Sequence, residues 1–353
     1  MFERVFKLSE HKTTVKTEVM AGITTFMTMA YILAVNPSVL GSTGMDTTAV
    51  LLATALASCL GTLCMAFMAN LPFALSAGMG LNAFMAYTVV AGYGYSWQVA
   101  LLAVFIEGLI FIVLSLTNIR EAIFNAIPLT LKKGVSVGIG LFIAFIGLQN
   151  SGLCVDSATL VGIISFPENF HTAGICALLT LIGLFFTAVF YTRKMKGAIL
   201  YGILLTWILG MLCQVTGLYV PTPDAGFYSL FPSWGMTDFS RLGLTFGQCF
   251  NVDFSAVGIV NFIVVIFSFL FVDIFDTLGT LIGVATKAKM LDKDGKLPGI
   301  KPALMADSIA TSAGAILGTS TTTTFVESAS GVAVGGRTGL TALVTGILFL
   351  VST

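Results

Sequence analysis

Charged residues are scarce in this sequence of 353 residues, of which only 10% are Asp, Glu, Lys or Arg. A soluble domain of average composition carries about 25%, so the chain has too little polar surface to face water on all sides. Positive and negative residues number 17 each, and no basic block occurs. The sequence therefore excludes an ordinary soluble protein, and nucleic acid is not an expected partner.

Motifs that carry covalent or metal chemistry are also lacking. The six cysteines form no CxxC pair, and the two histidines, His11 and His171, lie far apart, so neither a metal site nor a disulfide framework is expected. No HExxH, Walker or dinucleotide-binding pattern appears, and no nucleophile–base arrangement. Residues 1–19 contain no apolar core followed by a cleavage site, which argues against a removed signal peptide. We therefore expect no cofactor, no metal and no enzymatic activity.

Apolar stretches long enough to cross a bilayer as helices recur along the whole sequence. Hydrophobic residues make up 56% of the chain, and the mean hydropathy is +0.97. The alternating ten-residue segments of an outer-membrane barrel do not occur. We therefore predict an all-α polytopic membrane protein. Its predicted spans are 20–36, 49–70, 72–91, 98–116, 134–150, 172–190, 197–217, 258–285, 302–318, 320–336 and 337–353.

Lys and Arg residues fall on one side of the membrane in this arrangement of eleven spans. If residues 1–19 are a cytoplasmic lead-in, every Lys and Arg except Arg241 lies in a cytoplasmic segment. Such an asymmetry is the positive-inside pattern. The sequence therefore predicts a multi-pass protein of the cytoplasmic (inner) membrane, with residue 224 outside and residue 294 inside.

Two parts of the sequence resemble each other across an offset of 253 residues. ATALASCLGTLCMAF (53–67) with LSAGMG (75–80) aligns without gaps on ADSIATSAGAILGTS (306–320) with SASGVA (328–333). Each copy runs from a small-residue helix into a segment too polar and glycine-rich for an ordinary span. Because the period is seven spans, the copies cross the membrane in opposite directions, as in secondary transporters that bind substrate near the midplane. Chance similarity of two small-residue helices is the alternative.

Three acidic residues lie where the sequence should cross the membrane. Asp273 and Asp276 lie in VVIFSFLFVDIFDTLGTLIGV, three positions apart and so on one face of a helix. Glu327 lies in the second broken segment, TSTTTTFVESASGVAVGG, beside backbone groups that only protein or water could satisfy. A carboxylate at the bilayer centre costs about 2.5–3.5 kcal/mol on insertion scales. These acids are therefore candidates for substrate binding, with hydrogen bonding to a neighbouring backbone as the alternative.

Asn82 lies in the first broken segment, FALSAGMGLNAFMAY, where it would begin a short helix whose dipole favours electron-rich ligand atoms. Gly78 and Gly80 permit a close approach of the backbone, and Phe84 could stack on a flat ring. Helix capping is the alternative for Asn82, and packing is the alternative for Phe84.

Other functional classes could also use buried acids. An intramembrane aspartyl hydrolase would need two acids on separate, otherwise regular helices, whereas here the acids accompany paired broken segments. An ion channel would repeat around a pore instead of inverting. We favour structural roles for Glu107 and Asp307, and a surface position for His171. A secondary transporter is therefore the favoured class.

The same segments carry a family likeness. VMAGITTFMTMAYILAVNPSVL, LPFALSAGMGLNAFMAY, FVDIFDTLGTLIGVA and TTTTFVESASGVAVGGRTGL closely resemble the AzgA-like purine permeases. These form a branch of the nucleobase–cation symporter-2 (nucleobase–ascorbate transporter) family, and the chain looks most like its bacterial guanine/hypoxanthine permeases. The resemblance implies fourteen membrane segments in two inverted sevens, with a short β-strand and a half-helix in the third and tenth. About 11 of the 14 are expected in a sequence that stops at Thr353.

The resemblance also implies a division into domains. A core domain would comprise segments 1–4 (20–116) and segments 8–11 (258–353). A gate domain would comprise segments 5–7 (117–217), and residues 218–257 would form an extracytoplasmic loop. Expected partners are a purine base, a proton and the lipid bilayer, and a homodimer is left open.

Site residues are implied one by one. Asp273 and Glu327 correspond to the family's purine-binding acids, and Asp276 to a further residue of the site. Guanine or hypoxanthine is the favoured substrate and adenine the runner-up, with Asp273, Asp276 and Glu327 as candidates for proton coupling. The other positions that would bind or line the purine are Asn82, Gly80, Ser328 and the backbone near Phe73 and Ala74.

Overall fold

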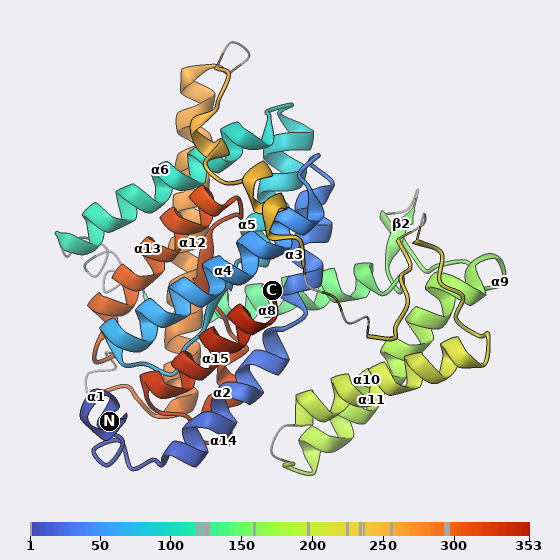
Figure 1. Cartoon of the computed structure of the whole chain (residues 1–353), viewed down its shortest axis with the longest axis horizontal. Coiled ribbons are helices and arrows are strands. Elements are labelled where there is room, and N and C mark those ends of the chain that lie inside the picture. Colours follow the sequence, from blue (N-terminus) through green and yellow to red (C-terminus); the bar gives the residue numbers. More distant parts are fainter. Residues whose placement is uncertain are drawn as a thin grey trace. The chain divides into compact units, whose positions relative to one another are not determined.

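The computed structural model is mostly helical and separates into two compact units (Figure 1). Unit 1 comprises Met1–Val137 and Met236–Thr353, and unit 2 comprises Gly138–Gly235. The structure describes residues 2–117, 119, 122, 128–157, 160–195, 198–223, 226–232, 235, 237–254, 257–292 and 297–353.

Long helices form unit 1, and polar side chains cap several of their starts. Asp46 caps α4 (Thr47–Cys64) and Ser96 caps α6 (Trp97–Leu116), in each case by accepting an amide hydrogen from the first turn. The unit's other helical elements are α1 (Phe2–Phe6), α2 (Val15–Met29), α3 (Ile32–Gly41), η1 (Met65–Ala69), α5 (Met79–Ala83), η2 (Phe84–Gly92), η5 (Phe239–Leu244), η6 (Gln248–Phe250), α12 (Ile259–Ala288), α13 (Ile300–Leu317), α14 (Ser328–Val334) and α15 (Gly339–Val351).

Small residues let the helices of unit 1 approach closely. Helix α13 packs on α4 and α6, and α15 packs on α2 and α4, so that α4 lies between α13 and α15 (Figure 1). A methyl group on Gly61 of α4 would come within 2.6 Å of the Cβ of Ala310 on α13. Packing of this kind is typical of membrane helices, which have little hydrophobic drive to associate and depend on close van der Waals contact.

Two broken segments meet inside unit 1. Strand β1 (Leu75–Ala77) pairs antiparallel with strand β4 (Thr322–Thr324), with Ser76 opposite Thr323. Every residue of both strands is buried, and each strand leads into a half-helix, α5 after β1 and α14 after β4. The structure therefore confirms the predicted pair of strand and half-helix segments.

The predicted repeat holds for the helices but not for the broken segments. Helices α4 and α13 have equal length and begin 253 positions apart, as predicted. The strands begin only 247 positions apart and the half-helices 249, so the gap-free alignment of 75–80 with 328–333 is wrong. The reason is that α4 continues into the π-helix η1, whereas α13 stops at Gly318, which takes a left-handed conformation with φ of 104°.

Apolar helices of membrane-spanning length occur at the predicted positions. Those long enough among the described residues are Val15–Gly41, Thr47–Ala69, Trp97–Leu116, Phe166–Thr192 and Ile259–Thr286. Shorter apolar helices are Met79–Gly92, Tyr201–Val215 and Gly339–Val351. Each coincides with a predicted span, so the prediction of a multi-pass membrane protein is confirmed.

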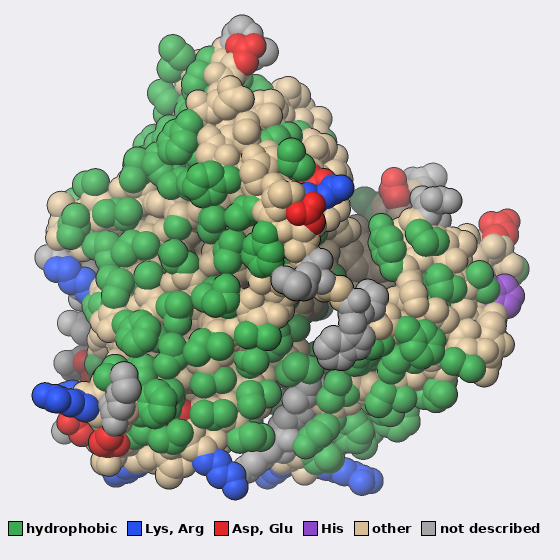
Figure 2. Space-filling view, in the orientation of Figure 1, with side chains coloured by type: hydrophobic (Ala, Val, Ile, Leu, Met, Phe, Trp, Pro, Cys, Tyr) green, Lys and Arg blue, Asp and Glu red, His purple; other side chains and the backbone are tan. Residues whose placement is uncertain are grey.

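The surface of unit 1 also fits a lipid environment. Hydrophobic side chains cover most of the face shown in Figure 2. On α12, Val260, Val264, Phe267 and Phe271 are all exposed and recur at helical spacing, which makes one continuous apolar stripe. Asp273, Thr277 and Thr280 of the same helix are buried and Asp276 is half-buried, so α12 has one side suited to lipid and another suited to a polar interior.

Unit 2 contains two packed helices and a short hairpin. Helix α8 (Leu129–Asn150) enters it, strands β2 (Val155–Ser157) and β3 (Leu160–Gly162) pair antiparallel, and α9 (Phe166–Asn169) with η3 (Phe170–Gly174) leads to α10 (Ile175–Thr192) and α11 (Ala198–Val215). Close contacts of Gly183 with Thr206 and of Gly202 with Thr187 join α10 to α11. His171 is exposed in this unit, as predicted.

Only part of the charge pattern can be followed in the structure. Arg241 forms an ion pair with Asp46 at 2.6 Å, so the start of α4 and the loop that carries Arg241 lie at the same end of unit 1. Other residues of the topology prediction lie outside the described residues, namely Arg120, Lys196, Lys293, Lys296 and positions 224 and 294.

Candidate functional site

The predicted site residues converge around the paired strands β1 and β4 of unit 1. Helix α12, which carries Asp273 and Asp276, contacts β4, α5 and α14. A methyl group on Gly78, at the end of β1, would lie 3.5 Å from Oδ2 of Asp276. Both Asp307 and Glu327 lie near enough to Asp276 for their charges to act on it. Acids from three separate segments therefore surround one point in the fold.

Thr277 links two buried carboxylates. Its Oγ1 lies 3.1 Å from Oδ1 of Asp273, one helical turn earlier, and 3.2 Å from Oδ2 of Asp307 on α13. The same hydroxyl lies 2.7 Å from Oγ1 of Thr323 in β4. All four residues are buried. Because a hydroxyl has one proton and carboxylates only accept, Thr277 can donate to only one of these neighbours at a time.

Asp307 belongs to the centre of the site, which the sequence did not indicate. We favoured a structural role for it because it follows closely on the cytoplasmic loop. In the structure it is fully buried and shares Thr277 with Asp273. The signal that could have found it is the acid itself, in a helix of otherwise small and apolar residues.

Glu327 lies at the start of α14 with one carboxylate oxygen fixed by protein. The hydroxyl of Tyr31, at the break between α2 and α3, donates to Oε1 at 2.7 Å. Oε2 makes no hydrogen bond to another of the described residues, and the side chain is only half-buried. The carboxylate is therefore held in place and still has an oxygen available for a ligand.

Tyr31 is a site residue that the sequence analysis missed. Its partner is 296 positions away along the chain, so no local pattern links the two. A weaker signal was present, because a tyrosine inside an apolar run brings a hydroxyl that must find a partner.

Asn82 presents a buried amide at the first half-helix. Its Oδ1 accepts a hydrogen bond from the hydroxyl of Ser320, and its Nδ2 is buried without a hydrogen-bond partner among the described residues. A buried polar atom left without a partner costs about 1–3 kcal/mol. Whichever way the amide is turned, one of its two polar atoms faces no protein partner here, so Asn82 is suited to bind a ligand.

Other predicted site residues connect the segment before β1 to the segment after β4. The amide of Ala74 donates to Oγ of Ser328 at 3.0 Å, and its carbonyl accepts from the amide of Phe325 at 2.9 Å. Phe73 is fully buried in the apolar core. These backbone groups therefore bond within the protein, and a purine that used them would have to displace those bonds.

Phe84 and Gly80 border the first half-helix. The ring of Phe84 packs edge-to-face on Phe269, with centroids 4.9 Å apart and an interplanar angle of 80°. Gly80 lies in α5 and is half-buried. Glu107 is fully buried on α6 and accepts from the hydroxyl of Thr321 at 2.8 Å, which fits the structural role predicted for it.

Within the described residues, His, Cys, Asp and Glu side chains form no group of three that could hold a metal ion. The polar groups gathered here are carboxylates, hydroxyls and one amide. Such a set suits a small, flat ligand with several hydrogen-bonding edges, and the acids can also exchange protons.

Comparison with known proteins identifies a family and several relatives. The model of the permease family (Xan_ur_permease) matches residues 16–353. A putative permease of Methanocaldococcus jannaschii is 48% identical over 351 residues, which cover 99% of this chain and 76% of that protein. The guanine/hypoxanthine permease PbuG of Bacillus subtilis is 46% identical over 358 residues, which cover 99% of this chain and 77% of that protein. The adenine permease AdeP of Escherichia coli is 43% identical over 354 residues, covering 99% and 74%.

Solved structures show the same fold at low sequence identity. The transmembrane domain of a cyanobacterium bicarbonate transporter, BicA, has a TM-score of 0.58 at 16% identity, over 95% of this chain and 80% of that one. The structure of SLC26A9 has a TM-score of 0.51 at 12% identity, over 97% and 54%. These likenesses support the predicted transporter fold, and the family match supports a transporter in place of an enzyme.

Proposed function

The chain belongs to the permease family, and we propose that it carries guanine or hypoxanthine across the cytoplasmic membrane in symport with a proton. The observation that carries the proposal is the Glu327 carboxylate, which Tyr31 fixes through Oε1 while Oε2 is left for a ligand. Guanine presents its N1–H and its amino group side by side. Oε2 can accept one of these donors, and Oε1 can accept the other with the lone pair that Tyr31 leaves unused. Hypoxanthine offers the N1–H alone.

Asn82 supports the preference for a 6-oxo purine. Its Nδ2 is the amide atom without a protein partner in the described part of the chain, and an N–H donor matches the 6-carbonyl oxygen of guanine and hypoxanthine. Adenine carries an amino group at position 6 and an acceptor at N1. The amino group of adenine would face the N–H donor of Asn82, and N1 of adenine, an acceptor, would face the carboxylate of Glu327. Neither pair can form a hydrogen bond.

Adenine stays the second candidate because relatives named adenine permeases are nearly as similar as those named guanine/hypoxanthine permeases. The Escherichia coli permease AdeP is 43% identical and the Bacillus subtilis permease PbuO is 44% identical. Rotation of the Asn82 amide would also let it accept from an amino group. Substrate choice is therefore tested directly below.

Proton coupling is proposed for the acids of α12 together with Glu327. Asp273 and Asp307 share the hydroxyl of Thr277, and rotation of that hydroxyl offers a path for a proton between them. Asp276 is half-buried beside Gly78 and can be reached more easily by water. We propose that Asp276 and Asp273 take up and release the coupled proton, and that Glu327 takes part in the coupling as well as binding the base.

Orientation and domain roles belong to the same proposal. The N-terminus would be cytoplasmic, which places the Arg241–Asp46 pair outside. Unit 1 would serve as the core that binds the substrate and unit 2 as part of the gate. A homodimer stays a prediction.

Two measurements test the proposal. Labelled hypoxanthine is first bound to the purified chain and competed with unlabelled guanine, adenine, xanthine and uracil. Guanine should compete best, and a result in which only adenine competes would make the chain an adenine permease. Uptake into cells without other purine permeases is then measured with and without an uncoupler. Uptake that an uncoupler leaves unchanged would contradict proton symport while leaving the binding result intact.

A further inference from the structure

A cavity lies in unit 1, away from the proposed purine site. Its volume is about 450 Å³, and it opens where α12 ends and α13 begins, beside the residues that precede β1. None of its lining residues belongs to the predicted purine site. By the predicted topology, this end of the unit faces the cytoplasm.

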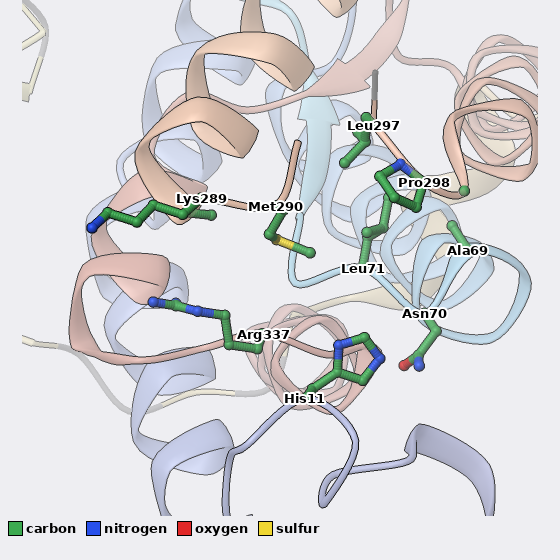
Figure 3. A pocket seen from close by; sticks show the side chains of 11 residues that line it. His11, Ala69, Asn70, Leu71, Lys289, Met290, Leu297, Pro298 and Arg337 are labelled. Atoms are coloured by element: carbon green, nitrogen blue, oxygen red, sulfur yellow. The ribbon is translucent and has the colours of Figure 1, made fainter. Parts of the chain in front are cut away.

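Basic side chains border this cavity on more than one side. Figure 3 shows the charged ends of Lys289 and Arg337 extending in the same direction, away from Leu71, and the ring of His11 near the base of Arg337. Within the described residues, neither Lys289 nor Arg337 forms an ion pair with an acid. The remaining wall includes apolar side chains, among them Leu71 and Met290.

The guanidinium of Arg337 uses one of its three nitrogens in hydrogen bonds within the described residues. Its Nη1 donates to the carbonyl oxygens of Val332 at 2.8 Å and Gly336 at 2.6 Å. A guanidinium has five N–H donors, so Nε and Nη2 have no partner among the described residues. These two atoms form a parallel pair of donors, the geometry that binds two oxygens of a phosphate.

Glu18, the acid that contacts the backbone of Arg337, forms no ion pair with the Arg337 side chain within the described residues. Glu18 accepts hydrogen bonds from the amides of Arg337 and Thr338 and from the hydroxyl of Thr341. Its carboxylate is therefore satisfied by three neutral donors and contacts no guanidinium nitrogen. No Asp or Glu is among the residues that line the cavity.

A position at a helix end could by itself explain why Lys289 is basic, but it does not explain Lys289 and Arg337 together. Lys289 is the C-cap residue of α12, where a positive charge favours the helix dipole. Its ammonium nevertheless bonds no terminal carbonyl in the described part of the chain. Arg337 already serves the end of α14 with Nη1 alone, so the other two donors need another explanation.

We propose that this cavity binds a phosphate-bearing ligand. Nε and Nη2 of Arg337 would bind two phosphate oxygens, Lys289 would add positive charge, and the ring of His11 would offer a hydrogen bond. Leu71 and Met290 would contact the carbon part of the ligand. The phosphate could belong to the headgroup of an anionic phospholipid or to a soluble phosphorylated compound, and the test separates these two sources.

The test uses the full purified chain and two probes that contain no purine ring. In the lipid arm, the chain in nanodiscs of dioleoylphosphatidylglycerol is compared with the chain in dioleoylphosphatidylcholine by retained lipid and by thermal unfolding. In the soluble arm, ribose 5-phosphate is titrated against the chain in detergent, with ribose as the unphosphorylated control. Hypoxanthine binding is measured in parallel, so that a failure of the purine site is seen separately.

Lys289→Gln is the informative variant, because the backbone of Lys289 ends α12 while its side chain makes no hydrogen bond or ion pair within the described residues. It should bind the effective probe about fivefold more weakly, since one Lys near an anionic group contributes about that factor. Lys16→Gln removes the same charge from the start of α2, away from the cavity lining, and should bind the probe like the unmodified chain. Binding in one arm alone identifies the source of the phosphate. Binding in neither arm, or equal binding by Lys289→Gln and Lys16→Gln, would overturn the proposal.

Discussion

Some side chains in this fold connect separate elements and also bind a carboxylate. Tyr31 lies at the break between α2 and α3, and its hydroxyl holds Glu327 through a 2.7 Å hydrogen bond. Thr277 belongs to α12 by sequence, yet its hydroxyl joins α12 to α13 and β4. Because such hydroxyls each serve a carboxylate, their removal should affect function more than stability.

Replacing Tyr31 by Phe should weaken purine binding roughly tenfold, because a hydrogen bond to a charged group contributes about 1.5–3 kcal/mol. The ring remains, so the fold should be kept. Competition binding of labelled hypoxanthine measures the change. Tyr228→Phe is the matched control, since Tyr228 is exposed in unit 2. Equal affinity of the two variants would remove Tyr31 from the site.

Replacing Thr277 by Val should uncouple transport from the proton gradient, because Val keeps the shape and removes the hydroxyl shared by Asp273 and Asp307. Thr277→Ser restores the hydroxyl and should restore coupling. The readout is the ratio of hypoxanthine uptake with and without an imposed pH gradient. A purely structural role would instead lower uptake under both conditions and leave this ratio unchanged.

At the level of elements, the antiparallel strands β1 and β4 position the candidate site. Antiparallel pairing of β1 with β4 satisfies backbone groups that lipid could not, and the half-helices then start on either side of the pair. The small-residue helices α4 and α13 pack closely behind these segments. The site therefore depends on how closely those helices approach.

Replacing Gly61 by Val should destabilise unit 1, because even its Cβ would lie 2.6 Å from Cβ of Ala310. Overpacking of this kind costs about 1–3 kcal/mol. Thermal unfolding of the purified chain should show a lower midpoint than for Gly147→Ala, whose added methyl group meets open space. If the Gly61 variant were as stable as the control, the packing of α4 on α13 described here would be wrong.

Sequence patterns predicted the elements better than the contacts between them. Apolar runs gave the spans, and the glycine- and hydroxyl-rich runs around Gly78 and Ser320 marked where helices break, since both signals are local. Contacts such as Tyr31 with Glu327 join residues 296 positions apart, and no local period encodes them. The repeat alignment failed at the strands because the π-helical extension of α4 shifts the register without an obvious sequence sign.

At the scale of the whole molecule, the proposed transport mechanism requires two halves that cross the membrane in opposite directions. The predicted topology places the loop with Arg241 outside and the end of α12 inside. Single cysteines at Asn251 and Lys289, introduced after the native cysteines are replaced, test this with a membrane-impermeant maleimide. Asn251→Cys should react in intact cells and Lys289→Cys only after permeabilisation. Reaction of both from the same side would contradict the inverted arrangement.

In the proposed mechanism, oppositely directed broken segments bring the Glu327 carboxylate to one purine site. The most direct measurement is the binding of labelled hypoxanthine to the purified chain carrying Glu327→Gln, compared with Glu168→Gln, which changes an exposed acid of unit 2. The account predicts that Glu327→Gln unfolds at the same temperature as the unmodified chain and loses binding, while Glu168→Gln binds normally. Full binding by a folded Glu327→Gln chain would contradict it.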